Sequence, residues 1–228
     1  MEGRGSHNRF KSYRYCPFFI AGVLLFYLIG CATSTDRCHP DFNHRIQPIK
    51  TLCLLPPEAI VYEELPDGRL KQRSDRSEAA GLSVQQALMT ELTARDFRVL
   101  TYPVDPTHRT AELQEVLSLY RVVNKSIQLH TFGPEVFAAK QTQFEYSVGP
   151  LKTLLQQNGA DAFVFVRVLY RYSLQQSRSF VSLGLADTTG TILWYGANGS
   201  REVASIEDPH KTTLLVKKVL MNFPEGRL

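Results

Sequence analysis

Apolar residues run together or alternate with polar ones in several segments, a pattern that predicts β-strands. Residues 49–55 form an apolar run that ends at two prolines, which is typical of a central strand. Residues 162–172 begin as a continuous apolar run and continue with arginines four positions apart, which predicts a strand covered on both faces at its start. Further strands are predicted at 97–102 and in two hairpins, 59–65 with 69–73 and 180–186 with 191–196.

Apolar residues at intervals of three and four predict amphipathic helices between these strands. The predicted helices cover residues 77–95, 110–123, 147–158 and 208–220, and a short helical piece follows Pro134. This order of elements predicts an α/β fold, in which a mixed β-sheet of about five strands is packed by three to four helices.

The N-terminus has the pattern of an export signal. Residues 1–15 are polar and basic, and residues 16–30 are apolar and uncharged. This apolar run of about 15 residues is short for a membrane-spanning helix, which needs about 20. Residues 1–30 are therefore predicted to be a signal peptide. The alternative is an uncleaved anchor that keeps the protein in the inner membrane.

The end of the apolar run, Leu28-Ile29-Gly30-Cys31, resembles the lipobox of bacterial lipoproteins. The resemblance implies cleavage between Gly30 and Cys31 and attachment of lipid to Cys31, which would anchor the protein in a membrane. Ala32 at the next position resembles lipoproteins that are sent to the outer membrane and face the periplasm. The polar residues that follow predict a tether over 31–47, before a single domain over 48–228.

Charge and length bear on the class of protein. Of the net charge of +4, residues 1–30 carry +3, so the remaining chain is almost neutral at +1. A dedicated nucleic-acid binder would need a basic face, so nucleic acid is not an expected partner. The 228 residues suffice for one domain of ordinary size.

Two cysteines, Cys38 and Cys53, follow Cys31 in the remaining chain. One alternative is a disulfide, which an oxidising compartment permits and which would close a loop of about 15 residues, worth about 3 kcal/mol. The other alternative is a buried Cys53 thiol on a core strand, which the apolar neighbours of Cys53 favour.

Few patterns in the sequence indicate chemistry. There is no phosphate-binding loop and no nucleophile elbow, so neither catalysis nor a cofactor is predicted. The segment from Cys38 to His44 contains a cysteine, two histidines and an aspartate, which allows a metal-binding or enzymatic alternative. On a mobile tether, however, the entropy of ordering opposes a fixed site, and no metal is expected.

Arg167, Tyr170, Arg171 and Tyr172 at the end of the long strand could form an exposed surface for a protein partner. Three further segments, 146–150, 158–166 and 185–194, resemble exported bacterial lipoproteins whose shared domain is similar to the TolB N-terminal fold, seen also in CsgG and LpoB. The resemblance covers about residues 49–222 and rests on structural motifs. It implies a non-catalytic interaction module that binds an envelope protein or associates with itself.

Overall fold

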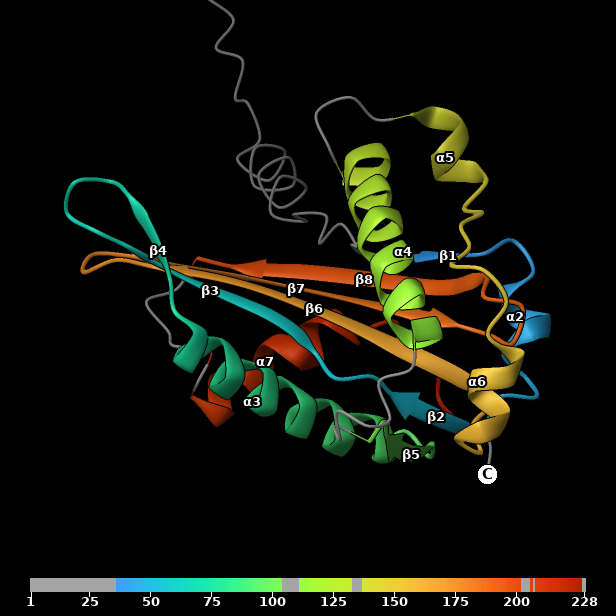
Figure 1. The fold of residues 1–228 in the computed structure, drawn as a ribbon. Coiled ribbons are helices and arrows are strands. Elements are labelled where there is room, and N and C mark those ends of the chain that lie inside the picture. The colour runs from blue at the N-terminus through green and yellow to red at the C-terminus, as the bar shows by residue number, and fades with distance from the viewer. Residues whose placement is uncertain (1–35, 104–110, 133–136, 202–205, 207, 227–228) are drawn as a thin grey trace, which may run out of the picture. The chain divides into compact units, whose positions relative to one another are not determined.

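The computed structural model describes residues 36–103, 111–132, 137–201, 206 and 208–226, and its centre is an eight-stranded mixed β-sheet (Figure 1). The signal segment, Gly30 and Cys31 lie outside these residues. The strands are β1 (Asp36–Cys38), β2 (Thr51–Leu54), β3 (Glu58–Glu64), β4 (Leu70–Gln72), β5 (Arg98–Thr101), β6 (Ala162–Tyr172), β7 (Ser177–Ala186) and β8 (Ile192–Ser200).

The helices are α2 (Phe42–Arg45), α3 (Ser74–Thr93), α4 (Ala111–Ile127), the π-helical turn η2 (Gln128–Phe132), α5 (Ala138–Thr142), α6 (Lys152–Gln157) and α7 (Pro209–Val219). Helix α7 begins as its sequence predicts, because the Asp208 side chain accepts hydrogen bonds from the backbone N–H groups of His210 and Lys211. None of the described helices is long and apolar enough to cross a membrane.

Strand β6 organises the sheet. Its whole length pairs antiparallel with β7, and its other edge is shared by two parallel strands, β2 along residues 162–164 and β3 along residues 167–172. Pro56 and Pro57 lie between β2 and β3, and a proline has no backbone N–H for the ladder. The parallel pairing with β6 is therefore interrupted at these prolines. Before them, β2 also pairs with β5, and after them, β3 also pairs with β4.

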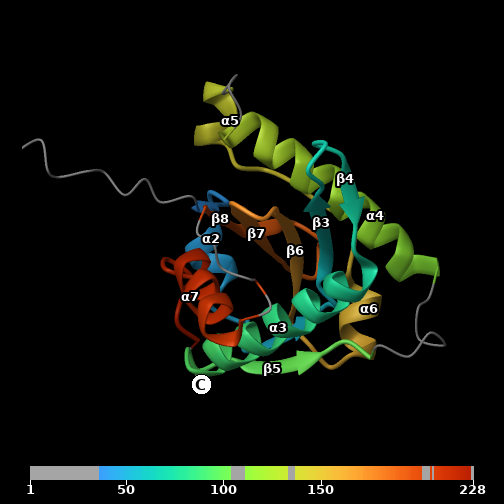
Figure 2. The same ribbon diagram turned by 90° about the vertical axis from the view of Figure 1, so that its left-hand side faces the viewer.

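Helices cover the two faces of the sheet unequally (Figure 2). Helices α3 and α7 lie on one face, over an apolar cluster that includes Leu88, Val164 and Val216. On the other face, α4 and α6 cover a second cluster that includes Leu154 and Phe163. Neighbouring positions of β6 contribute to opposite clusters, as the two-residue period of a strand requires.

The turn between β7 and β8 packs against the loop before α6. Gly190 ends this turn with a φ of 78°, and a Cβ at this position would lie 1.6 Å from the carbonyl oxygen of Gly149. Both the backbone conformation and the close approach therefore require glycine at residue 190.

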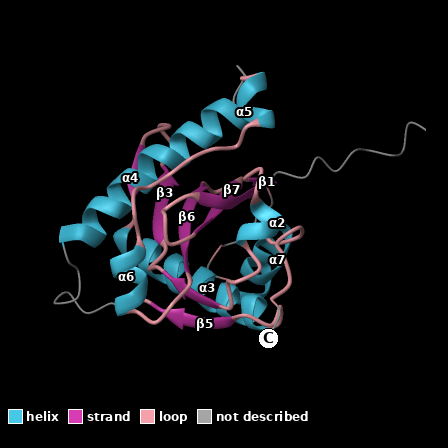
Figure 3. Cartoon of the chain, turned by 90° about the vertical axis from the view of Figure 1, so that its right-hand side faces the viewer, coloured by secondary structure: helices cyan, strands magenta, loops and turns pink. Residues whose placement is uncertain are grey.

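The predicted α/β fold with a mixed sheet is confirmed, and the strand at 162–172 has the predicted bounds. The start of the domain differs. Residues 36–47 lie in the predicted tether, but they form β1, which pairs with β8, and the short helix α2. Figure 3 shows β1 and α2 beside each other. The tether prediction is therefore wrong for this stretch, because a three-residue strand and a four-residue helix are too short to show a hydrophobic period.

Candidate interaction surface

The predicted partner residues at the end of β6 do not share one exposed face. Arg167 and Arg171 are half-buried on the α4 side of the sheet, whereas Tyr170 is buried on the α3 side, with 3% exposed. Tyr172 is half-buried beside Tyr170, with their rings stacked 5.6 Å apart. The prediction of Tyr170 as a surface residue is therefore wrong, because β6 is a central strand and its even positions pack under α3.

On the α4 side, the described residues leave the part of the sheet beyond α4 incompletely covered. Leu169 is 47% exposed there, between Ile60 of β3 and Phe180 of β7, its partners in the two ladders. Ile60 and Phe180 are themselves only half-buried. We call these three residues, with Arg167 and Arg171 beside them on the same strand, the open sheet face.

Ion pairs position the two arginines of the open sheet face. Arg167 lies 2.9 Å from the Glu58 carboxylate, which also binds Arg121 of α4 at 2.7 Å. Arg171 lies 2.9 Å from Glu64. Each side chain in these pairs is about a quarter to a half exposed, so the pairs add modest stability and mainly hold the arginines in place around Leu169.

A buried polar cluster holds α4 on the sheet next to this face. The Asn124 side-chain oxygen accepts hydrogen bonds from the hydroxyl groups of Ser182, at 3.0 Å, and Tyr195, at 2.9 Å. Gln128 also donates to the Tyr195 hydroxyl at 3.2 Å. Burial raises the pKa of Tyr195 to about 12, so its phenol stays protonated at neutral pH. These hydrogen bonds orient the helix on the sheet.

Tyr120 approaches the sheet beside that cluster. A Cβ on Gly184 would lie 2.7 Å from the Tyr120 hydroxyl oxygen, so the glycine makes room for the ring. Among the described residues this hydroxyl has no hydrogen-bond partner, and burial raises its pKa well above the usual value. The ring itself stacks on Phe165, with centroids 4.3 Å apart.

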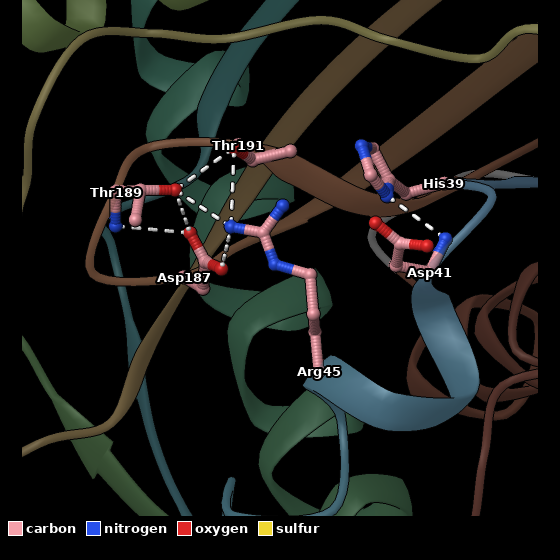
Figure 4. A network of polar contacts seen from close by, with 6 residues as sticks. All are labelled: His39, Asp41, Arg45, Asp187, Thr189 and Thr191. Atoms are coloured by element: carbon pink, nitrogen blue, oxygen red, sulfur yellow. Dashed lines mark hydrogen bonds and ion pairs between the residues drawn. The ribbon is translucent and has the colours of Figure 1, made fainter.

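At the opposite end of the sheet, Arg45 attaches α2 to the turn between β7 and β8 (Figure 4). Its guanidinium pairs with the Asp187 carboxylate and donates to the Thr189 hydroxyl at 2.7 Å and the Thr191 hydroxyl at 3.3 Å. Asp187 also accepts from the Thr189 backbone N–H at 3.0 Å. This network secures the segment that the sequence predicted as a tether.

An open cavity of about 850 Å³ lies beside this network, lined in part by His44, Asp161 and Asp187. Asp161 accepts hydrogen bonds from the backbone N–H groups of Lys50 and Thr51, at 3.0 and 2.8 Å. Both carboxylates therefore have structural partners.

The segment from Cys38 to His44 does not gather its side chains into a metal site. His39 accepts a hydrogen bond from the Asp41 backbone N–H at 3.1 Å, while His44 lies at the cavity described above. Within the described part of the chain, no three His, Cys, Asp or Glu side chains are grouped so that they could hold a metal ion.

Cys38 and Cys53 are free thiols. Cys38 is exposed on the edge strand β1 and Cys53 is buried on β2, with β8, β7 and β6 between them. Neighbouring strands lie about 4.8 Å apart, which puts the two cysteines far beyond disulfide range. The structure therefore has the buried Cys53 thiol and not the disulfide. Burial raises the pKa of Cys53 to about 12.

Sequence reasoning missed Ile60 and Phe180 as surface residues. Each lies in an apolar stretch that resembles core, and only the two β6 ladders bring them beside Leu169. The single available signal was the alternation after Val166, where Arg167 and Arg171 share a face with Leu169.

No protein-family model and no curated protein matches the chain. Solved structures similar to it include the PelC dodecamer from Paraburkholderia phytofirmans, at 15% identity and a TM-score of 0.45, over 86% of this chain and 99% of that one. Lipoprotein GNA1162 from Neisseria meningitidis has 17% identity and a TM-score of 0.36, over 75% and 94%. The LpoB C-terminal domain from Salmonella enterica has 14% identity and a TM-score of 0.28, over 71% and 99%. At such identities and TM-scores, the likeness carries no conclusion about function.

Proposed function

We propose that the chain is a lipid-anchored lipoprotein of the bacterial outer membrane, facing the periplasm, whose α/β domain binds a protein partner and catalyses no reaction. Residues 1–30 are its signal peptide and Cys31 carries the lipid. The domain extends from residue 36, with only residues 31–35 between it and the anchor.

The open sheet face supports the binding role. It presents exposed Leu169 with half-buried Ile60 and Phe180, and it is flanked by Arg167 and Arg171. An apolar centre that includes Phe180, with an arginine rim, suits a protein contact, because aromatic side chains and arginine are enriched at protein interfaces. The occupant we propose is a second protein of the cell envelope, and a second copy of this chain is the competing occupant.

Site-specific photo-crosslinking in intact cells tests the binding role. A photoreactive residue in place of Leu169 should form a covalent adduct with one envelope protein. The same residue in place of Leu82, which is 61% exposed on α3 at the other face, serves as the matched control and should form none. An adduct with the mass of a dimer would assign the face to self-association, and no adduct at residue 169 would overturn the proposal.

The anchor is tested separately with Cys31→Ser. The native protein should lack residues 1–30, carry acyl mass and partition into membranes, whereas the variant should lose both the acyl mass and the membrane attachment. A full-length native mass, with a variant that stays in the membrane, would instead assign residues 16–30 to a permanent anchor.

A further inference from the structure

The direction of β1 determines at which side of the sheet the chain enters the domain. β1 runs antiparallel to β8, with Cys38 opposite Trp194 and Asp36 opposite Gly196. Moving back along the chain from Cys38 to Asp36 therefore leads toward Ser200, the end of β8. Ser200 pairs with Ser179, close to the turn that joins β6 and β7.

The connection to the anchor is short. Asp36 is the fifth residue after Cys31, so the two Cα atoms lie at most about 18 Å apart when the chain between them is fully extended. A flexible tether through residue 47, as the sequence predicted, would have allowed the domain to move well away from the bilayer. Because β1 is paired with β8, a lipid on Cys31 would keep Asp36 within about 18 Å of the anchor.

Two hairpin tips lie together at the end of the sheet at which β8 ends (Figure 1). We call this region, residues 63–73 and 171–178, the hairpin end. The Glu64–Arg171 ion pair and the pairing of Glu63 with Tyr172 join its two hairpins. Each hairpin exposes a leucine, Leu174 with 91% exposed and Leu70 with 47%.

Charge at the hairpin end favours an anionic surface. The region contains five basic and three acidic residues. All three carboxylates lie in ion pairs with arginines: Glu63 with Arg73, Glu64 with Arg171 and Asp67 with Arg69. The surplus corresponds to Lys71 and Arg178, which are both exposed. Exposed leucine beside unneutralised basic groups is the chemistry that binds an anionic lipid surface.

We propose that the hairpin end rests on the surface of the membrane in which Cys31 is anchored, with Leu174 at the lipid interface and Lys71 and Arg178 on anionic headgroups. This inference rests on the proposed anchor. It orients the β7–β8 turn and Arg45 away from the bilayer, and leaves Leu169 and Arg167 of the open sheet face free at the side of the domain.

Lipid quenching of a fluorescent probe tests the orientation. The full lipidated protein, carrying Cys38→Ser so that the exposed natural thiol is absent, is reconstituted in vesicles of phosphatidylethanolamine and phosphatidylglycerol. A polarity-sensitive fluorophore is attached at Leu174→Cys or, as the control, at Met221→Cys. Met221 is 67% exposed at the opposite end of the domain, two residues before Phe223, which packs on Phe97.

The probe at residue 174 should shift to the blue and lose emission to a headgroup-attached quencher, and the probe at 221 should do neither. Adding Lys71→Glu and Arg178→Glu should reduce the quenching at 174 while the protein still floats with the vesicles. Flotation without quenching at 174 would overturn this inference and leave the anchor intact. A protein that does not float would overturn both.

Discussion

Tyr120 on α4 and Tyr195 on β8 are both buried between the helix and the sheet, but only the Tyr195 hydroxyl has a hydrogen-bond partner among the described residues. A buried hydroxyl without a partner has lost its hydrogen bonds to water and makes none in the folded protein to replace them. We therefore expect Tyr120→Phe to leave the free energy of unfolding unchanged or to raise it by up to about 1 kcal/mol. Urea unfolding of the native protein and the variant measures this difference.

Tyr195→Phe is the matched control for that substitution. It removes the bond to the Asn124 side chain at 2.9 Å and should lower the free energy of unfolding by about 1 kcal/mol. A clear loss of stability in Tyr120→Phe would mean that its hydroxyl has a partner, such as a bound water molecule.

The buried Cys53 thiol should make the free energy of unfolding fall at alkaline pH. Burial raises the pKa of its thiol from 9.0 to about 12 in the folded protein, so the folded state keeps a proton that the unfolded state has lost. The contribution of the protonated thiol to the free energy of unfolding is complete below about pH 9. It is lost as pH rises toward about 12, at up to about 1.4 kcal/mol per pH unit. In Cys53→Ala, the decline of unfolding free energy with pH over this range should be shallower. An equal decline in both proteins would contradict the assignment.

At the scale of elements, β1 and α2 depend on a few contacts near Arg45. The Arg45 and Asp187 side chains are only 24% and 12% exposed, so their pair is better shielded from solvent than most surface pairs. We expect Arg45→Ala to lower the free energy of unfolding by about 1–2 kcal/mol. Hydrogen exchange of the amides in residues 42–46 should accelerate more than exchange in β6.

Arg69→Ala removes an ion pair of the same type at an exposed site. The Arg69 and Asp67 side chains are 78% and 50% exposed, so this variant should show no measurable change in stability. If Arg45→Ala behaves in the same way, then the segment over residues 36–47 is held by its strand pairing and not by the arginine.

The elements differ in how far the sequence could predict them. The strand at 162–172 and the β7–β8 hairpin carry long apolar patterns and a turn with glycine, and the structure has both. β1 was missed, because Asp36-Arg37-Cys38 has no apolar pattern and is a strand only through its pairing with β8. Pairing of this kind is a tertiary effect that local propensity does not contain.

The candidate surface shows the same limit. Arg167 and Arg171 could be found from their spacing, but Tyr170 was assigned to the surface because the sequence does not show that α3 packs over its face. Ile60 and Phe180 come from distant parts of the chain, and only the parallel and antiparallel ladders of β6 place them beside Leu169.

At the scale of the whole molecule, the two faces and two ends of the sheet have different roles. One face is closed by α3 and α7, and the other leaves the open sheet face beyond α4. One end carries the Arg45 network and the other carries the hairpins. In the arrangement that we propose, the connection between Cys31 and β1 is short, the hairpin end meets the membrane and the Arg45 network lies away from it.

The length of that connection gives a prediction about the whole molecule. A flexible insert of about 15 Gly and Ser residues between Ser34 and Thr35 raises the connection to about 20 residues, with a root-mean-square span of about 25 Å. The insert precedes β1, so the domain should unfold as before and the lipid should still anchor it. The hairpin end, however, should spend less time at the lipid surface, and a probe at Leu174→Cys should lose less emission to the lipid quencher. A replacement of residues 32–35 by an equal number of Gly and Ser residues keeps the reach and should keep the quenching. Undiminished quenching with the long insert would mean that Leu174, Lys71 and Arg178 bind lipid without help from the short connection.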